Sequence, residues 1–364
     1  MTATTGVQAE LLQGSDAIVR SSILAGCRFF AGYPMAPFTQ LLESFSKHLP
    51  ENGGVCMNAE SEIEAVNMTL GASSTGARVA TGSTGEGIAL MQEAIAEAAF
   101  NELPMVIFNI ARGQQDYFQA TRGGGWGDYR TPTLAPKNVI EAVEHTHLLF
   151  DLADRYRVPT LMYGDYLVAH TQVSVAIEPR EFPPLPPKDW ALDGSSGGTG
   201  VAKEHFAYAI GKTNAPGIGP NAHWNNIAGK FRDMEKAEAR FEGNHLDDAE
   251  TLIVSFGTSS VFVDHVVEEL RADGHRIGTF RPITLWPFAY DALEQAANGA
   301  RRVYSFELNA GQMIDDVLIA VQNRHKVRSI GGLSQDSYGL RQGSMLDAPV
   351  IRDRVLSALE ADRA

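Results

Sequence analysis

The sequence predicts an α/β protein of two doubly wound domains, each built around a mostly parallel sheet. Short apolar runs typical of strands alternate with stretches whose apolar residues recur at helical spacing, which indicates βαβ units with right-handed crossovers. The 364 residues suffice for two such domains, and a segment rich in proline and glycine separates two blocks of the pattern. We therefore expect one domain over residues 1–178, a linker with a connecting helix over 179–248, and a second domain over 249–364.

The first domain contains five predicted strands that alternate with helices. Ser15 or Asp16 is expected to cap the first helix. The run PMVIFNIAR has the continuous apolar character of a buried parallel strand. We expect strands over 27–34, 53–59, 77–83, 104–112 and 158–166. We expect helices over 15–25, 37–49, 58–73, 87–102 and 135–156.

The middle segment accumulates proline between Pro179 and Pro187 and continues into GSSGGTG, a composition typical of a linker or an irregular arm. The run AHWNNIAGKFRDMEKAEARF that follows is a charged helical segment, for which we expect a solvated face or a subunit contact. The alternation of strands and helices then resumes. Strands are expected over 251–257, 276–282 and 301–307, and helices over 259–274, 290–299 and 311–324.

Composition and charge argue against several classes of protein. A formal net charge of −14 disfavours non-specific binding of nucleic acid. No apolar run reaches the roughly 18 residues of a membrane span. The two cysteines, Cys27 and Cys56, are too few for a four-cysteine iron–sulfur cluster or a disulfide framework. Since the first residues also lack the basic start and apolar stretch of a signal peptide, a cytoplasmic location is expected.

The strands of the first domain run into loops of small or polar residues. Ligands of open parallel sheets bind outside the carboxyl ends of the strands, so several such loops together indicate one site, although in any single loop glycine serves a turn equally well. The run GSTGEG lacks the spacing of a phosphate-binding loop and carries Glu86, so we do not expect it to cradle phosphate. The loops are Gly32–Pro34, Asn58–Glu60, Gly82–Gly85 and Arg112–Gln114.

One carboxylate falls where an apolar residue is expected. Wound as a helix, NAESEIEAVNMTLGAS starts its inward stripe with Glu62, whereas Glu60 and Glu64 fall on a face that water can reach. Burying a charge without a partner is costly, so Glu62 needs a hidden partner or a chemical role. An ion pair with Arg78 is one alternative, and Glu60 takes the position if the helix register differs. The stripe continues with Ala65, Val66, Thr69 and Leu70.

Several segments match one known family in order and spacing. In the first half these are GYPMAPFTQ, AESEIEAVNMTLGAS, ATGSTGEGIALMQEAI, LPMVIFNIARG and RGGGWGDYRTPTLAP. In the second half they are HWNNIAGKFRDMEKAE, ETLIVSFGTSS, RPITLWPF and VYSFELNAGQM. Over about residues 10 to 345 the chain resembles the α subunit of 2-oxoacid:ferredoxin oxidoreductases. The resemblance implies a pyrimidine-binding domain followed by a transketolase C-terminal-like domain.

The resemblance implies thiamine diphosphate as the cofactor, with its aminopyrimidine ring held by the first domain. Glu62, Ala65 and Gly71 fit the family pattern Glu-x-x-Ala-x-x-x-x-x-Gly, whose glutamate faces N1′ of that ring. A carboxyl there favours the 4′-imino tautomer, which takes the proton from C2 of the thiazolium. Glu62 is therefore the expected catalytic residue. Further cofactor contacts are expected from Tyr33, Pro34, Met35, Ser83, Gly85 and Glu86.

The resemblance places the metals on partner subunits. Related enzymes hold Mg²⁺ with Gly-Asp-Gly and a later asparagine, but here Asp128 and Asp165 lie in Gly-Asp-Tyr, so no metal site is expected on this chain. We expect a β subunit that carries the diphosphate and Mg²⁺, and γ or ferredoxin-like subunits, with the [4Fe-4S] clusters on partner subunits. The complex is expected to be a hetero-oligomer, with a dimer of heteromers as one arrangement, and this chain alone to be inactive.

The chain departs from the family where a 2-oxoacid is expected to bind. Ala36 replaces a threonine whose hydroxyl helps to hold the substrate carboxylate, and Glu86 adds a carboxylate nearby. Arg112 matches the family arginine and is the expected remaining anchor, unless it forms a structural ion pair. Gln115 and Arg122 are also expected to contact substrate. Four residues either line a pocket for a bulky or aromatic substrate or pack on the β subunit: Tyr117, Phe118, Arg122 and Trp126.

The activity implied by the resemblance is the conversion of a 2-oxoacid and coenzyme A to acyl-CoA and CO2, with reduction of ferredoxin or a similar acceptor. One alternative is the β chain of a 2-oxoacid dehydrogenase E1 component, which shares both domain types but hands its acyl group to lipoamide. Another is a non-catalytic scaffold that has lost the chemistry, an alternative to which Ala36 and Glu86 give weight.

Overall fold

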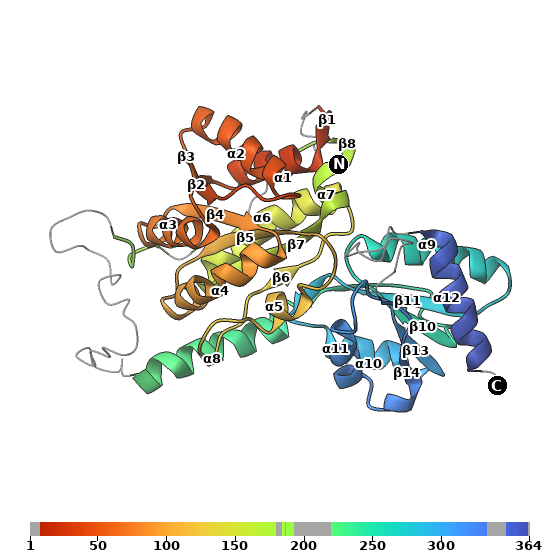
Figure 1. Ribbon diagram of the computed structural model, residues 1–364. Helices are drawn as coiled ribbons and strands as arrows, with labels where there is room; N and C mark the ends of the chain where they lie inside the picture. The colour runs from red at the N-terminus through yellow and green to blue at the C-terminus, as the bar shows by residue number, and fades with distance from the viewer. Residues whose placement is uncertain (1–7, 180–183, 186, 193–219, 333–346, 363–364) are drawn as a thin grey trace, which may run out of the picture.

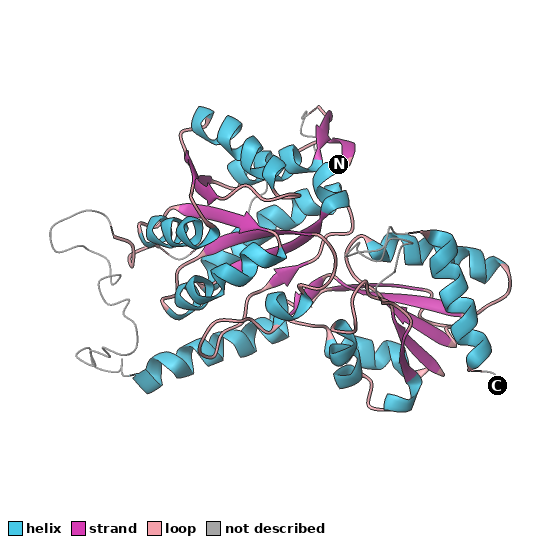
Figure 2. Ribbon diagram, in the orientation of Figure 1, coloured by secondary structure: helices cyan, strands magenta, loops and turns pink. Residues whose placement is uncertain are grey.

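The computed structural model describes residues 8–179, 184–185, 187–192, 220–332 and 347–362. Two α/β units lie side by side, and each has a central sheet flanked by helices (Figure 1, Figure 2). The predicted fold class is thereby confirmed. Among the described residues, no helix combines the length and the apolar character that crossing a bilayer demands.

The larger sheet contains seven strands. Six come from the first half of the chain: β2 (Cys27–Gly32), β3 (Val55–Asn58), β4 (Arg78–Ser83), β5 (Met105–Ala111), β6 (Thr133–Leu134) and β7 (Pro159–Asp165). The seventh, β12 (Thr284–Trp286), comes from the second half. Their order is β12-β6-β7-β5-β4-β2-β3, and all neighbours run parallel except β12 and β6. The five strands predicted for the first domain are all present.

Helices cover both faces of this sheet, because successive strand residues point to opposite sides. On β5, Phe108 packs in one buried cluster and its neighbour Ile107 packs in another. The Phe108 face is covered by α1 (Gly14–Leu24), α2 (Thr39–Glu51) and α6 (Val139–Tyr156). The Ile107 face is covered by α3 (Glu62–Ser74) and α4 (Gly85–Phe100). Short elements complete this half: the antiparallel pair β1 (Glu10–Gln13) and β8 (Gln172–Val175), with α5 (Tyr117–Thr121) and α7 (Tyr166–His170).

The charged helix of the middle segment packs on its own chain. This helix, α8 (Pro220–Ala237), runs along the first domain (Figure 1). Its residues Ile227, Phe231 and Met234 recur on one face and are buried in the main hydrophobic cluster. This apolar face packs within the chain, whereas charged residues of the same helix such as Arg232 and Glu235 are exposed, as expected for a solvated face. The apolar stripe of three residues was hidden among them.

The smaller sheet contains five strands in the order β14-β13-β10-β11-β9. They are β9 (Phe241–Asn244), β10 (Thr251–Val254), β11 (Ile277–Pro282), β13 (Arg302–Ser305) and β14 (Val327–Ser329). All pairs are parallel except β9 with β11, and β9 precedes residue 249. The strands and helices predicted for this half are present. The helices are α9 (Ser259–Ala272), α10 (Tyr290–Asn298), α11 (Met313–Ala320) and α12 (Ala348–Ala361), with a 3-10 turn at Arg324–Lys326.

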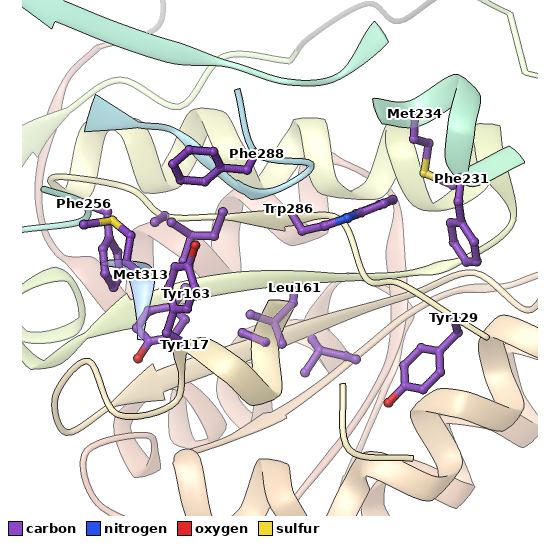
Figure 3. Close-up of a cluster of buried hydrophobic side chains, with 14 of the residues drawn as sticks. Tyr117, Tyr129, Leu161, Tyr163, Phe231, Met234, Phe256, Trp286, Phe288 and Met313 are labelled. Atoms are coloured by element: carbon purple, nitrogen blue, oxygen red, sulfur yellow. The ribbon is translucent and has the colours of Figure 1, made fainter. Parts of the chain in front are cut away.

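The two domains share one hydrophobic cluster, shown in Figure 3. Leu161 and Tyr163 of β7 belong to it together with Phe256, Trp286 and Phe288 from the second half of the chain. Because β12 also extends the larger sheet, the second domain supplies both a strand and apolar side chains to the first. The position of the loops around β5 and β7 therefore depends on both domains.

A buried glutamine ties the loop after β5 to the second domain. Gln114 Nε2 donates a hydrogen bond to the carbonyl of Phe256 over 3.0 Å, and its Oε1 accepts from the N–H of Leu308 over 2.7 Å. Asn309 Nδ2 donates to the carbonyl of Gln114 over 2.7 Å. The loop that begins at Arg112 is therefore held by residues almost 200 positions further along the chain.

Candidate functional site

The loops that follow four parallel strands meet at the carboxyl edge of the larger sheet. Gly32 of β2 is in register with Asn58 of β3 and with Gly82 of β4, and Ser83 is in register with Asn109 of β5. The segments after these strands therefore leave the sheet side by side, where open parallel sheets bind ligands. Tyr33, Pro34 and Met35, the predicted cofactor contacts after β2, are all at least partly exposed there.

Glu62 begins α3 at this edge and is only 3% exposed. The hydroxyl of Ser61 caps the helix by accepting from the N–H of Glu64 over 3.3 Å. Ser83 Oγ, at the end of β4, donates to Glu62 Oε1 over 3.1 Å. The positive end of the α3 dipole also favours a carboxylate at this position. The buried carboxylate is therefore held in a defined orientation.

A glycine permits the close approach of α4 to Glu62. A Cβ on Gly87 would lie 2.0 Å from Ser83 Oγ and 2.5 Å from Glu62 Oε1, which are shorter than any real contact of a Cβ atom. A side chain at position 87 would therefore displace the hydroxyl, the carboxylate or the helix. The hydrogen bond between Ser83 and Glu62 depends on this glycine.

No basic side chain pairs with Glu62 in the part of the chain that the structure describes. The alternative partner, Arg78, is engaged elsewhere: its Nε lies 2.7 Å from Asp154 Oδ2, and its Nη1 donates to the carbonyl of Ala25. Glu60 is exposed, so the predicted helix register is confirmed. Within the described residues Glu62 Oε2 accepts no hydrogen bond, which leaves it available to a donor on a ligand.

Arg112 follows β5 and forms an ion pair with Glu86 at the start of α4. Arg112 Nη1 lies 2.6 Å from Glu86 Oε1, and Arg112 Nε donates to the carbonyl of Ala36 over 3.1 Å. Thr84 Oγ1 donates to Glu86 Oε2 over 3.0 Å and lies 3.1 Å from Met35 Sδ. The N–H of Glu86 lowers the pKa of its own carboxyl, and Thr84 and Arg112 lower it further. Since the side chains are 43% and 60% exposed, the pair adds little to stability.

A hollow of about 480 Å³ lies beside this ion pair. Half of the residues that line it are predicted site residues. One of these, Gln115, has a buried side-chain nitrogen without a hydrogen-bond acceptor among the described residues. The hollow therefore brings together predicted contacts from the loops after β4 and β5. It is lined by Gly85, Glu86, Arg112, Gly113, Gln115, Asp116, Phe118 and Gln119.

Asp116 is a carboxylate of the hollow that the sequence analysis missed. Burial raises the pKa of Asp116, and the nearby charge of Glu86 raises it further, against the hydrogen bond that Asn109 Nδ2 donates to Asp116 Oδ2 over 3.1 Å. One residue in the sequence, Asn109, could have pointed to Asp116. A fully buried amide in the otherwise apolar strand MVIFNIA needs a polar partner nearby.

Tyr117 and Arg122 both contact Asp316 of the second domain. Tyr117 Oη donates to Asp316 Oδ2 over 2.6 Å, and Arg122 Nη2 lies 2.9 Å from the same oxygen. Tyr117 is fully buried in the interdomain cluster (Figure 3), so the expectation that it lines a pocket or packs on a β subunit is wrong. Arg122 is not among the residues that line the hollow, and its contact with substrate stays a prediction. Phe118 does line the hollow.

Trp126 also packs within the chain. Its Nε1 donates to Glu97 Oε1 over 2.9 Å, and its ring centroid lies 5.4 Å from that of Phe100 and 6.2 Å from that of Trp224. These contacts place Trp126 between α4 and α8, away from the residues that line the hollow. Tertiary packing against α8 accounts for this exposed aromatic residue of the Gly-rich loop.

The acidic residues of the two Gly-Asp-Tyr segments do not gather with other ligands. Asp165 accepts hydrogen bonds from the N–H of Val168 and from Thr258 Oγ1, and burial raises its pKa. Asp128 is exposed. Within the described ranges, no group of three or more histidine, cysteine or acidic residues is arranged to hold a metal ion.

The fold and this edge define a class: a two-domain α/β protein whose first domain presents a buried carboxylate and an arginine at the carboxyl ends of its strands. Residues 20–193 match the family described as "Pyruvate flavodoxin/ferredoxin oxidoreductase, thiamine diP-bdg". Residues 249–342 match "Pyruvate:ferredoxin oxidoreductase core domain II". The chain belongs to the 2-oxoacid:ferredoxin oxidoreductases, as an α-type subunit with a thiamine diphosphate-binding first domain.

Relatives with different named substrates are equally similar to the chain. Ketoisovalerate oxidoreductase subunit VorB of Methanothermobacter thermautotrophicus is 34% identical over 326 residues, which cover 85% of this chain and 89% of the relative. 2-Oxoglutarate synthase subunit KorA of the same organism is 34% identical over 339 residues, which cover 84% and 89%.

Two solved structures share the fold. A 2-oxoglutarate:ferredoxin oxidoreductase from Magnetococcus marinus gives a TM-score of 0.79 at 23% identity, over 96% of this chain and 65% of the longer one. A split gene transketolase, described as an inactive tetramer, gives 0.59 at 13% identity, over 98% of this chain and 99% of that one.

Proposed function

We propose that this chain is the α subunit of a thiamine diphosphate-dependent complex that converts a 2-oxoacid and coenzyme A to acyl-CoA and CO2 and reduces ferredoxin or a similar acceptor. The observation that carries the proposal is the environment of Glu62. It is buried, oriented by Ser83 and without a cation partner in the described residues. A carboxylate in that setting needs a partner from outside the chain, and the thiamine diphosphate of the matched family offers one.

The geometry of Glu62 suits the aminopyrimidine ring of this cofactor. Ser83 engages Oε1, so Oε2 is the oxygen that would meet N1′ of the ring and hold a proton there. Burial at the start of α3 keeps water from competing for that hydrogen bond. Bound thiamine diphosphate supplies the nucleophilic carbon that attacks the 2-oxo group.

Arg112 is the proposed anchor for the carboxylate of the 2-oxoacid. A guanidinium binds a carboxylate through two hydrogen bonds. The carbonyl of Ala36 holds Arg112 Nε, which leaves the Nη groups to face a ligand and Glu86. Gln115 offers an amide nitrogen in the same hollow. These contacts support a substrate position next to the predicted cofactor contacts Gly85 and Glu86.

Exposed apolar side chains on the elements around Glu62 support a shared site. Five apolar side chains of β3, α3 and α4 are each at least 40% exposed, and a surface of this kind is typical of a protein contact. We propose that the β subunit, with the diphosphate and Mg²⁺, covers this surface, and that other partners carry the iron–sulfur clusters. These exposed residues are Val55, Met57, Ile63, Met68 and Leu90.

The names of the relatives favour this activity over that of an E1 β chain, since they are subunits of ketoisovalerate oxidoreductase and 2-oxoglutarate synthase.

The two cysteines support a reducing compartment such as the cytoplasm. Cys27 and Cys56 are free thiols, and burial raises their pKa values to about 12 and about 11.

The proposal is tested in the reconstituted complex by Glu62→Gln. We expect the variant to assemble but to lose at least 100-fold in viologen reduction, because an amide cannot exchange the proton at N1′. Glu64→Gln, an exposed neighbour on the same helix, is the matched control and should keep its activity. Wild-type turnover in the Glu62 variant would refute the role. A wild-type complex that binds no thiamine diphosphate would favour the scaffold alternative.

A further inference from the structure

The hollow beside the proposed substrate anchor carries more negative than positive charge. Three charged residues contribute to its lining, namely Glu86, Arg112 and Asp116. The remaining lining residues are glycines, two amides and the ring of Phe118. Two carboxylates and one guanidinium therefore line the hollow before any substrate enters.

One Nη group of the Arg112 guanidinium is already paired with Glu86. Arg112 Nη1 lies 2.6 Å from Glu86 Oε1, and Thr84 holds the other oxygen of Glu86 over 3.0 Å. A 2-oxoacid can therefore bind Arg112 only if it shares the guanidinium with Glu86 or displaces Glu86 from it. In either case the charge of Glu86 stays at the rim of the hollow, because Thr84 Oγ1 holds its carboxylate there.

Asp116 adds its charge from the loop after β5, which lies against the start of α4. Asn109 holds one oxygen of Asp116 over 3.1 Å, and Tyr163 Oη accepts from the N–H of Asp116 over 3.2 Å, so its position is set by the sheet beneath. The other oxygen would lie 2.1 Å from a Cβ at Gly85, which places the carboxylate against the residue next to Glu86. Like charges held this close disfavour a third one in the same space.

We propose that Glu86 and Asp116 make this site selective for 2-oxoacids with one carboxylate and an uncharged side chain, and exclude dicarboxylic 2-oxoacids. The inference rests on the proposed function and names its substrate class. A second carboxylate in the hollow would face Glu86 and Asp116, with no further cation among the residues that line it. Sequence identity does not decide between the classes, since relatives named for ketoisovalerate and for 2-oxoglutarate are both 34% identical.

The test compares 2-oxohexanoate with 2-oxoglutarate, two unbranched acids that differ mainly in the distal carboxylate. In the reconstituted complex we expect kcat/KM, read by viologen reduction, to be at least tenfold higher for 2-oxohexanoate. Glu86→Gln should raise the ratio of kcat/KM for 2-oxoglutarate to that for 2-oxohexanoate at least tenfold. In the cofactor-free complex, Glu86→Gln should also raise the equilibrium affinity for 2-oxoglutarate relative to that for 2-oxohexanoate, because the effect is on binding.

The matched control is Glu93→Gln, an exposed carboxylate two turns further along α4, which should leave the ratio unchanged. Equal or better use of 2-oxoglutarate by the wild type overturns the inference, even if Glu86→Gln does not assemble. An assembled Glu86 variant with the wild-type ratio overturns it as well. A complex that binds thiamine diphosphate but turns over neither acid, nor any other 2-oxoacid, contradicts the proposed function instead.

Discussion

Two carboxylates at the carboxyl edge of the larger sheet, the buried Glu62 and the half-buried Asp116, have different surroundings. Glu62 lies at the start of α3 and accepts a hydrogen bond from Ser83, which fixes the orientation of its carboxyl group. Asp116 lies beside Glu86, and burial and this second charge raise its pKa. The first carboxyl group is therefore positioned for a partner from outside the chain, whereas the charge of the second costs free energy in the folded protein.

Replacement of Asp116 by asparagine tests that cost. Because folding raises the pKa of Asp116, the folded protein binds the proton more tightly than the unfolded chain, and stability falls as pH rises through the window between the two pKa values. We expect Asp116→Asn to increase the free energy of unfolding relative to wild type at pH 7. The advantage should vanish at roughly pH 3, below the ordinary pKa of an aspartate.

Urea denaturation at several pH values measures this difference. The amide oxygen of the variant still accepts from Asn109, so the hydrogen bond is kept. Asp128→Asn, at an exposed position, should show no such pH dependence. A variant that is less stable than wild type at pH 7 would contradict the argument.

At the scale of elements, the contact between α5 and α11 joins the two domains. Asp316, in the first turn of α11, accepts hydrogen bonds from Tyr117 and Tyr290 and pairs with Arg122. Its carboxylate is fully buried. One carboxylate of α11 therefore holds three partners at the domain boundary, two from α5 and its C-cap and one from α10.

Removal of this carboxylate should destabilise the protein strongly. Asp316→Ala leaves Arg122 without its partner, and the hydroxyls of the buried Tyr117 and the half-buried Tyr290 without an acceptor, so we expect a loss of about 3–5 kcal/mol in the free energy of unfolding. Asp315→Ala, at the exposed neighbouring position, is the control and should change stability by less than about 0.5 kcal/mol. Chemical denaturation of both variants measures the effect, and similar values for the two would show that Asp316 is not a structural link.

At the scale of the whole molecule, the two domains form one packed body. β12 extends the larger sheet, and one hydrophobic cluster contains Leu161 of the first domain and Phe256 of the second (Figure 3). Gln114 adds buried hydrogen bonds across the boundary. Inter-domain surfaces of this apolar kind favour a fixed arrangement rather than independent motion.

Calorimetry of the isolated chain tests this coupling. Since each domain buries apolar surface of the other, unfolding of one exposes the core of its neighbour, and we expect a single thermal transition for both. A chain ending at residue 248 should expose the Leu161 side of the cluster and aggregate. Two well-separated transitions in the full-length chain would contradict the expectation.

Much of the fold follows from local patterns in the sequence. The strands and helices of both α/β blocks were predictable because a period of two or of 3.6 residues identifies an element without reference to the rest of the chain. The two-residue strand β6 and the three-residue β12 were not, since so few residues carry no period. The stripe of Ile227, Phe231 and Met234 was missed because charged neighbours outnumber it.

The same division holds for the candidate site. Glu62 was predictable because its place at the head of a buried stripe depends on helical spacing alone, and Ser83 and Arg112 because each closes or follows a strand. Asp116 was not, since no pattern marks an aspartate that its loop brings into a half-buried position beside Glu86. The role of Tyr117 was misjudged because its partner Asp316 lies 199 residues further on.

By itself, the sequence determined two α/β domains, the carboxyl edge of the first domain at which the ligand loops gather, and a buried acidic residue, Glu62, at that edge. The physical reason is that periodicity of apolar side chains decides which face of each element is buried. Only the tertiary structure decided that Glu86 pairs with Arg112, that Asp116 lines the same hollow, and that Tyr117 packs on the second domain. Those contacts arise where distant segments meet, and no local spacing encodes them.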